Sequence, residues 1–140
     1  MDQIMQIGRL RKEGFRIGKT RKFMLELFFN LKGTITAAEL KKELYQAGIT
    51  SDRVTFYREI NFLKKQKIIS EIELGDHQKR YELAFNNHHH HLICRACKKV
   101  FKIELNKSLE KELEQVGNNG KFVVESHLLE FFGRCKNCLV

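Results

Sequence analysis

The chain has 140 residues, 42% apolar and 31% charged, a balance typical of a soluble globular protein with a modest core. No stretch approaches the ~18 uninterrupted apolar residues of a membrane span, and the first residues lack a signal-peptide core, so we expect a cytoplasmic protein with no membrane partner. Residues 1–84 carry 17 Lys and Arg against 11 Asp and Glu, hence +6 of the net charge of +9. This half is therefore the candidate for binding a polyanionic partner, and a merely solvated basic face is the alternative.

The first predicted helix follows the segment "GKTR" at residues 18–21. Apolar side chains recur along it every three or four residues, which is the spacing of one buried helix face. That face consists of Phe23, Leu27 and Leu31, with Met24 and Phe28 beside them.

A second predicted helix begins at Thr36-Ala-Ala-Glu39, which has the Ser/Thr-x-x-Glu pattern of a capping box. Leu40 and Leu44 are expected to face inward, and Gly48 is expected to end the helix. The sequence therefore predicts two helices joined by a short loop.

A third predicted helix starts near Ser51 or Asp52, since either side chain can cap it. One face is apolar at positions i, i+4 and i+7, and the opposite face is polar. The apolar residues are Phe56, Ile60 and Leu63, and the polar ones are Arg53, Tyr57, Asn61 and Lys64, with Arg58 on the flank.

Two strand-like runs, residues 68–74 and 79–83, follow this helix and are joined by Gly75-Asp76-His77-Gln78, which indicates a hairpin. Three helices and a hairpin are the order of a winged helix, a fold that places a helix in the DNA major groove. Tyr57 can touch thymine methyl groups and Arg58 can reach guanine or phosphate. A solvated helix face is the alternative for these two residues.

The pattern changes near residues 85–87, after which strands are predicted at residues 92–93, 100–103 and 121–132. A short helix is predicted between the last two strands. It is marked by Leu109, Leu113 and Val116 and closed by the turn Asn118-Asn119-Gly120. We therefore expect an α+β protein with a winged-helix domain over residues 1–85 and a small α+β domain over residues 86–140.

Two Cys-x-x-Cys pairs lie in the second half. Thiols of a cytosolic protein are more often metal ligands than disulfides, and Zn²⁺ favours four thiolates in a closed tetrahedron. A redox role is the alternative, although it lacks a βαβ context. The predicted structural zinc ligands are Cys94, Cys97, Cys135 and Cys138.

Four consecutive histidines, residues 88–91, lie in the middle of the chain, where a purification tag is not placed. In an extended segment alternate side chains share a face, so His88 and His90 point one way and His89 and His91 the other. The four can therefore serve two sites. Imidazole and carboxylate together suit zinc, iron or manganese. The other candidate ligands are Glu82, Glu110 and His127.

The segments "LRKEGFRIGKTRKFMLEL", "VTFYREINFL", "HHHHLICRAC" and "GRCKNC" together resemble the ferric uptake regulator (Fur) family over residues 10–138. The resemblance implies a homodimeric, metal-responsive repressor that binds a double-stranded DNA operator. Its winged helix would bind the DNA, and its C-terminal domain would form the dimer.

The resemblance also implies roles for single residues. Tyr57 and Arg58 match the family's major-groove pair, and Arg16 matches its minor-groove residue, while Lys12 and Arg53 are further basic candidates for DNA contact. The four cysteines match structural zinc ligands. His88, His90, Glu110 and His127 match a complete site of the dimerisation domain, in which His90 favours zinc. Glu82, His89 and His91 match part of an inter-domain site whose usual histidine is replaced by Thr34.

We therefore expect a repressor of iron or zinc homeostasis genes that needs structural Zn²⁺ and a regulatory divalent metal, namely Fe²⁺, Zn²⁺ or Mn²⁺. An enzyme with a small organic substrate is not expected, because a four-ligand site leaves no open position. One alternative is a zinc-stabilised hydrolase that uses His88, His90 and Glu110 with a metal-bound water. Another is a metal-buffering or adaptor protein without DNA binding.

Overall fold

The computed structural model describes residues 2–74, 77–84, 89–117, 120–125, 127 and 129–139. The chain forms two compact units, Met1–Asn86 and Asn87–Val140, called here the N-terminal and C-terminal units. Within the described residues, no helix has the length and apolar character needed to cross a membrane. Part of each predicted turn lies outside the described residues, namely residues 75–76 of the turn at 75–78 and residues 118–119 of the turn at 118–120. Residues 85–88, around the expected domain boundary, also lie outside them.

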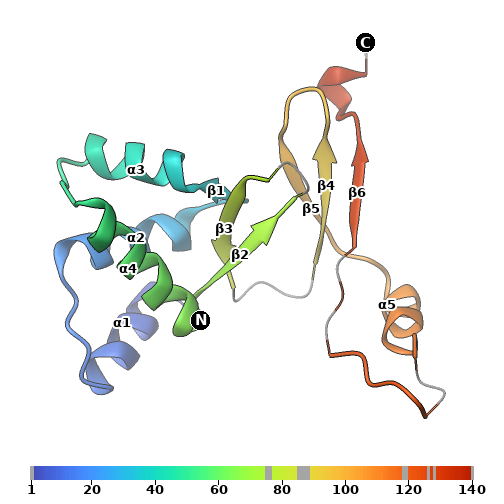
Figure 1. Cartoon of the computed structure of the whole chain (residues 1–140), viewed down its shortest axis with the longest axis horizontal. Helices are drawn as coiled ribbons and strands as arrows, with labels where there is room; N and C mark the ends of the chain where they lie inside the picture. The colour runs from blue at the N-terminus through green and yellow to red at the C-terminus, as the bar shows by residue number, and fades with distance from the viewer. Residues whose placement is uncertain are drawn as a thin grey trace. The chain divides into compact units, whose positions relative to one another are not determined.

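Over its described residues, the N-terminal unit has four helices and a three-stranded antiparallel sheet (Figure 1). The helices are α1 (Gln3–Lys12), α2 (Lys19–Asn30), α3 (Ala37–Gln46) and α4 (Arg53–Lys65), and the strands are β1 (Ile35–Thr36), β2 (Ile69–Glu73) and β3 (Lys79–Leu83). β3 is the middle strand, and its Tyr81 is paired with Ile35 of β1 and with Glu71 of β2. The three predicted helices are α2, α3 and α4, and the antiparallel pair β2 and β3 that follows them confirms the winged-helix prediction.

Local sequence signals set the helix ends. Thr36 and Glu39 form the predicted capping box, with Glu39 N–H donating to Thr36 Oγ1 at 3.2 Å and Thr36 N–H donating to Glu39 Oε2 at 2.8 Å. At the start of α4 the cap is Asp52 and not Ser51, because Asp52 Oδ1 accepts the N–H of Thr55 at 2.7 Å. These bonds satisfy backbone donors that have no partner inside the helix.

The core of the N-terminal unit is apolar and spans all four helices and the sheet. The inward residues predicted for α3 and α4 are buried, as expected: Leu40, Leu44, Phe56, Ile60 and Leu63. On α2, however, the fully buried residues are Met24, Leu25 and Phe28, while Phe23, Leu27 and Leu31 are only partly buried. A helix that packs against several neighbours buries a wide stripe, and the prediction placed the centre of that stripe one residue too early.

The structure adds two elements that the sequence pattern did not predict. Helix α1 starts after Asp2, whose Oδ1 accepts the N–H of Met5 at 2.8 Å, and it buries Leu10 and Gln6 completely or nearly so. The two-residue strand β1 has no alternation to detect, because it is defined only by its pairing with β3.

Over its described residues, the C-terminal unit has a three-stranded sheet, one α-helix and one short 3₁₀ helix (Figure 1). The strands are β4 (His90–Cys94), β5 (Val100–Ile103) and β6 (Glu130–Gly133), and the helices are α5 (Lys107–Glu114) and η1 (Lys136–Cys138). β4 lies in the middle, antiparallel to β5 and parallel to β6. The α+β class predicted for this half is confirmed.

The strand predicted over residues 121–132 is wrong for most of its length. Of the described residues from 121 onward, only Glu130 to Gly133 form a strand, while residues 121–125 are irregular. Phe122 and Val123 are 68% and 83% exposed, so the apolar run is not a buried strand. A strand needs a neighbour, and β4 pairs with this segment only from His91 to Cys94.

Candidate metal centres and nucleic-acid interface

The four cysteines meet at one end of the C-terminal sheet. Cys94 ends β4, and its register partner in the parallel strand β6 is Gly133, two residues before Cys135. Because parallel strands end at the same edge of a sheet, the turns that follow β4 and β6 lie side by side. Each turn is closed by a backbone bond, from Lys98 N–H to Cys94 O at 2.9 Å and from Cys138 N–H to Cys135 O at 2.8 Å.

The sulfur positions fit a tetrahedral metal. Cys97 Sγ and Cys135 Sγ are 3.8 Å apart, and all four sulfurs lie within 4.8 Å of one another. A Zn–S distance of ~2.3 Å gives tetrahedral S–S edges of about 3.8 Å. All four cysteines are free thiols, so the arrangement suits Zn²⁺ and not a disulfide.

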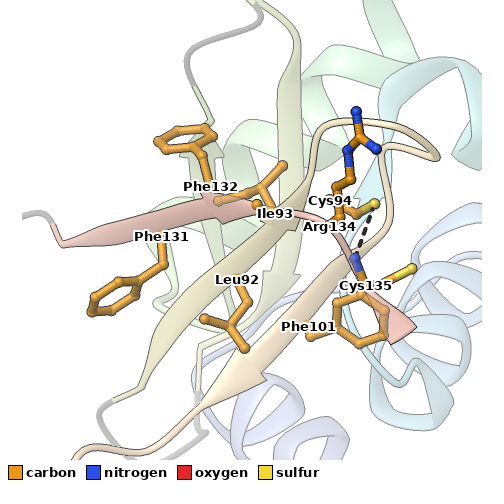
Figure 2. Close-up of a pocket in the computed structure, with 9 residues that line it drawn as sticks. Leu92, Ile93, Cys94, Phe101, Phe131, Phe132, Arg134 and Cys135 are labelled. Atoms are coloured by element: carbon orange, nitrogen blue, oxygen red, sulfur yellow. Dashed lines mark hydrogen bonds between the residues drawn. The ribbon is translucent and has the colours of Figure 1, made fainter. Parts of the chain in front are cut away.

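Backbone donors prepare one of these thiols for metal. Cys94 Sγ accepts the N–H of Cys97 at 3.5 Å and that of Cys135 at 3.4 Å, the second bond being drawn in Figure 2. These bonds lower the pKa of Cys94 to about 6. The hydrogen bond with Cys135, together with desolvation, raises the pKa of Cys138 to about 12. The fold therefore favours one thiolate, at Cys94, and a bound dication is needed to keep all four cysteines ionised.

A second cluster joins three segments of the C-terminal unit. His90 of β4 is 3% exposed, and its Nε2 lies 2.9 Å from Oε1 of Glu110 in the first turn of α5. The His127 ring lies 5.4 Å from the His90 ring, and the ligand atoms of the three residues are within 4.8 Å of one another. The predicted fourth ligand, His88, lies outside the described residues. The nitrogen and oxygen donors suit Zn²⁺, Fe²⁺ or Mn²⁺.

The neighbouring histidines have different surroundings. The rings of His89 and His91 meet edge to face at 5.0 Å, and His91 is buried. His90 therefore contacts Glu110 while His91 contacts His89, as expected when neighbouring residues of a strand point to opposite faces.

Glu82 and Thr34 lie in the N-terminal unit. Glu82 is a buried residue of β3, and the β1–β3 register, continued by one residue, sets Thr34 opposite it. Thr34, the position at which the family resemblance predicts a histidine, is therefore a register neighbour of Glu82.

The predicted DNA-binding residues lie on α4, at the end of α1 and in the loop that follows α1. Arg53 and Arg58 are exposed and Tyr57 is half-buried on that helix. Lys12, at the end of α1, and Arg16, in the loop between α1 and α2, are also exposed.

The structure adds a basic residue that the sequence pattern did not single out. Lys41 Nζ of α3 lies 5.0 Å from the ring centroids of both Phe56 and Tyr57. Arg53 lies 5.8 Å from the Tyr57 ring on the same helix. Tyr57 is thus flanked by two cations, an environment that attracts phosphate. Lys41 shares no helix with Tyr57, so only the packing of α3 on α4 reveals it.

An apolar pocket lies on the C-terminal sheet beside the cysteines (Figure 2). Leu92 of β4 is in register with Phe101 of β5 and Phe131 of β6, so the three side chains form a row across one face. Phe101 and Phe131 are 42% and 41% exposed, and Phe132 is 45% exposed. The C-terminal unit therefore presents aromatic surface that its described residues leave uncovered.

Comparison with known proteins identifies the family. The sequence model of the ferric uptake regulator family matches residues 12–132. The chain belongs to the ferric uptake regulator family. It is 30% identical over 131 residues to the ferric uptake regulation protein of Campylobacter upsaliensis, covering 92% of this chain and 83% of that protein. It is also 30% identical over 134 residues to the peroxide-responsive repressor PerR of Staphylococcus epidermidis, covering 94% and 87%.

Solved structures agree with this assignment. The structure of the Helicobacter pylori ferric uptake regulator Fur superposes with a TM-score of 0.80 at 25% identity, covering 97% of this chain and 91% of that one. The family, the fold and the function predicted from the sequence are thus confirmed, and the chain is a Fur-family transcriptional regulator. The comparisons give no support to the hydrolase or the metal-buffer alternative. The roles of single residues stay predictions.

Proposed function

We propose that the chain is a cytoplasmic, homodimeric repressor that binds a double-stranded DNA operator when a regulatory divalent metal is bound, and that it is not an enzyme. The observation that carries this proposal is the presence of two clusters of different ligand chemistry in one unit. Four thiols form the first cluster, and His90, Glu110 and His127 form the second. A soft, closed site suits permanent Zn²⁺, while nitrogen and oxygen ligands suit a metal that exchanges.

The cysteines would hold the structural Zn²⁺. Four thiolates complete its tetrahedron, which leaves no position for a substrate. Because Cys94 ends β4 and Cys135 follows the parallel strand β6, the metal would fasten the segment after β6 to β4. Its charge would also offset the thiolates that the fold brings together.

The histidine cluster would hold the regulatory metal, with His88 as the proposed fourth ligand. The bound metal would link β4, the first turn of α5 and the segment that carries His127. Iron, zinc and manganese all accept this donor set. The further assignment of Glu82, His89 and His91 to a weaker inter-domain site rests on the family resemblance.

On the DNA side, α4 is proposed to enter the major groove, where Tyr57 and Arg58 read bases. Arg16 would reach the minor groove, and Lys12 and Arg53 would contact phosphates. The excess of basic residues over residues 1–84 supports this role for the N-terminal unit.

The C-terminal unit is proposed to form the homodimer. The exposed row of Phe101, Leu92 and Phe131 gives it apolar surface to bury, and aromatic side chains dominate the energetics of such interfaces. Two winged helices held in one dimer can bind two half-sites together, which raises affinity without any new contact.

Elemental analysis of untagged protein, before and after mild chelation, tests the proposal. We expect one zinc per chain to resist chelation and a second divalent metal to be removed. DNA binding to a duplex selected from a random pool should disappear with the second metal and return when it is restored. A protein that holds one metal only, or that binds DNA equally well after chelation, would contradict the proposal.

A further inference from the structure

A largely buried ion pair joins two helices of the N-terminal unit. Arg21 lies in the first turn of α2, and Glu59 lies on α4 next to Arg58. Arg21 Nε donates to Glu59 Oε2 at 2.8 Å and Nη2 donates to Oε1 at 3.0 Å. The two side chains are only 15% and 14% exposed. A two-pronged contact shielded from water is stronger and better defined than an exposed ion pair.

The same guanidinium has a third partner. Arg21 Nη1 donates to the backbone carbonyl oxygen of Arg16 at 2.7 Å. Arg16 lies in the loop between α1 and α2 and is the residue proposed for the minor groove. A single planar group therefore contacts both the helix proposed to read the major groove and the backbone of this loop.

An aromatic contact strengthens this connection. The guanidinium carbon of Arg21 lies 3.6 Å from the centroid of the Phe62 ring, also on α4. The ring of Phe15, the residue before Arg16, meets Phe62 edge to face at 5.0 Å. The loop thus contacts α4 directly through Phe15, and Arg21 of α2 links the backbone of Arg16 to α4.

We propose that Arg21 is a positioning residue that fixes the spacing between the recognition helix and the Arg16 loop, so that major-groove and minor-groove contacts are made together. The DNA part of this inference rests on the proposed function. Fixing the loop before binding removes an ordering cost that the complex would otherwise bear. A lysine at this position keeps the charge but lacks the planar fork that serves Glu59 and the carbonyl together.

The hold on the loop can be measured without DNA. The amide of Phe15 donates to Leu10 O at 2.9 Å, so its hydrogen exchange reports how firmly the loop is fixed. Arg21→Lys and Glu59→Gln should both speed this exchange, the first by roughly fivefold or more. Lys22→Gln, which removes a charge from the same turn of α2, is the matched control and should leave it unchanged. Unchanged exchange in Arg21→Lys would overturn the positioning role.

The consequence for DNA is tested with a duplex that the parent protein selects from a random pool in the presence of metal. Arg21→Lys should weaken binding about tenfold in the parent background but less than about twofold in the Arg16→Ala background, because coupled residues are not additive. It should also lower the preference for A·T over G·C in the flanks read by Arg16. The proposal is contradicted if Arg21→Lys lowers DNA affinity equally in the parent and Arg16→Ala backgrounds, and equally on duplexes with A·T and G·C flanks. Arg21 would then act through general stability. If the parent selects no duplex, the proposed function fails, and the Phe15 exchange alone decides whether Arg21 holds the loop.

Discussion

The Nε2 atom of His90 lies 2.9 Å from Oε1 of Glu110, which joins the start of β4 to the first turn of α5. The imidazole is buried and the carboxylate is 20% exposed. A metal bound here would accept both atoms as ligands and would require a neutral imidazole. The same contact therefore marks the place where the proposed regulatory metal would bind.

Glu110→Gln should weaken the exchangeable metal site and leave the structural zinc in place. Loss of a second-shell partner already costs about 10–100-fold in metal affinity, so loss of a ligand should cost at least about tenfold. Competition against a fluorescent chelator measures the affinity. Glu112→Gln, an exposed carboxylate two residues along α5, is the control and should bind metal like the parent. Equal affinities of the two variants would remove Glu110 from the site.

Cys135→Ser should lose the tightly held zinc and the dimer together, because the binding energy of a structural zinc is part of the folding energy. Elemental analysis and light scattering on the same sample report both properties. Lys136→Ser changes an exposed residue of the same turn without removing a thiolate and should keep both. The structural role is wrong if the Cys135 variant stays a folded dimer without zinc.

Much of the fold could be predicted because its signals are local. The capping box at Thr36 and the apolar spacing of Phe56, Ile60 and Leu63 depend only on neighbouring residues, and the structure confirms them. The cap choice between Ser51 and Asp52 required coordinates, since both side chains can accept the same amide. The irregular structure of residues 121–125 could not be predicted, because their apolar pattern is typical of a strand. β4 pairs with this part of the chain at residues 130–133 instead.

Some residues of the candidate sites could be predicted from the sequence, and others are revealed only by the structure. Spacing alone pointed to the four cysteines, since paired Cys-x-x-Cys units are a strong pattern. The grouping of His90 with Glu110 came from the family resemblance, and the structure brings these two residues together. Sequence patterns could not reveal the contact of Lys41 with Tyr57 or that of Arg21 with Glu59, because each contact joins two helices and depends on how they pack.

Arg58→Ala should cost about 1–3 kcal/mol at the selected duplex and relax the preference at one base pair, because a forked base contact carries sequence information. Lys12→Ala should weaken all duplexes alike and reduce the slope of log affinity against log salt by about one. Binding titrations on selected and random duplexes at several salt concentrations separate the two effects. Equal losses of Arg58→Ala on both duplexes would make Arg58 a phosphate contact.

The stability of the winged helix should depend on pH through Asp52. The hydrogen bond from the Thr55 backbone N–H holds the pKa of Asp52 below its usual value of 3.8. The ionised carboxylate of Asp52 therefore stabilises the folded state. This stabilisation is complete when the pH is above the pKa of Asp52 in the unfolded chain, and it is lost as the pH falls through the lower pKa of Asp52 in the folded protein. Asp52→Asn keeps a capping oxygen but not the charge. Urea unfolding should show a constant difference from the parent at neutral pH that narrows below about pH 4. A difference independent of pH would contradict this assignment.

Metal-dependent DNA binding can be measured in a single titration. The protein, with its structural zinc in place, is titrated onto a fluorescently labelled selected duplex with and without Mn²⁺, a divalent stand-in that does not oxidise in air as Fe²⁺ does. We expect metal to tighten binding by at least about tenfold, within the usual range of coupling between two sites, and chelation to reverse the effect. The Glu110→Gln variant should need more metal for the same response. Equal DNA affinity with and without the metal, at a metal concentration that fills the exchangeable site, would contradict metal-dependent DNA binding.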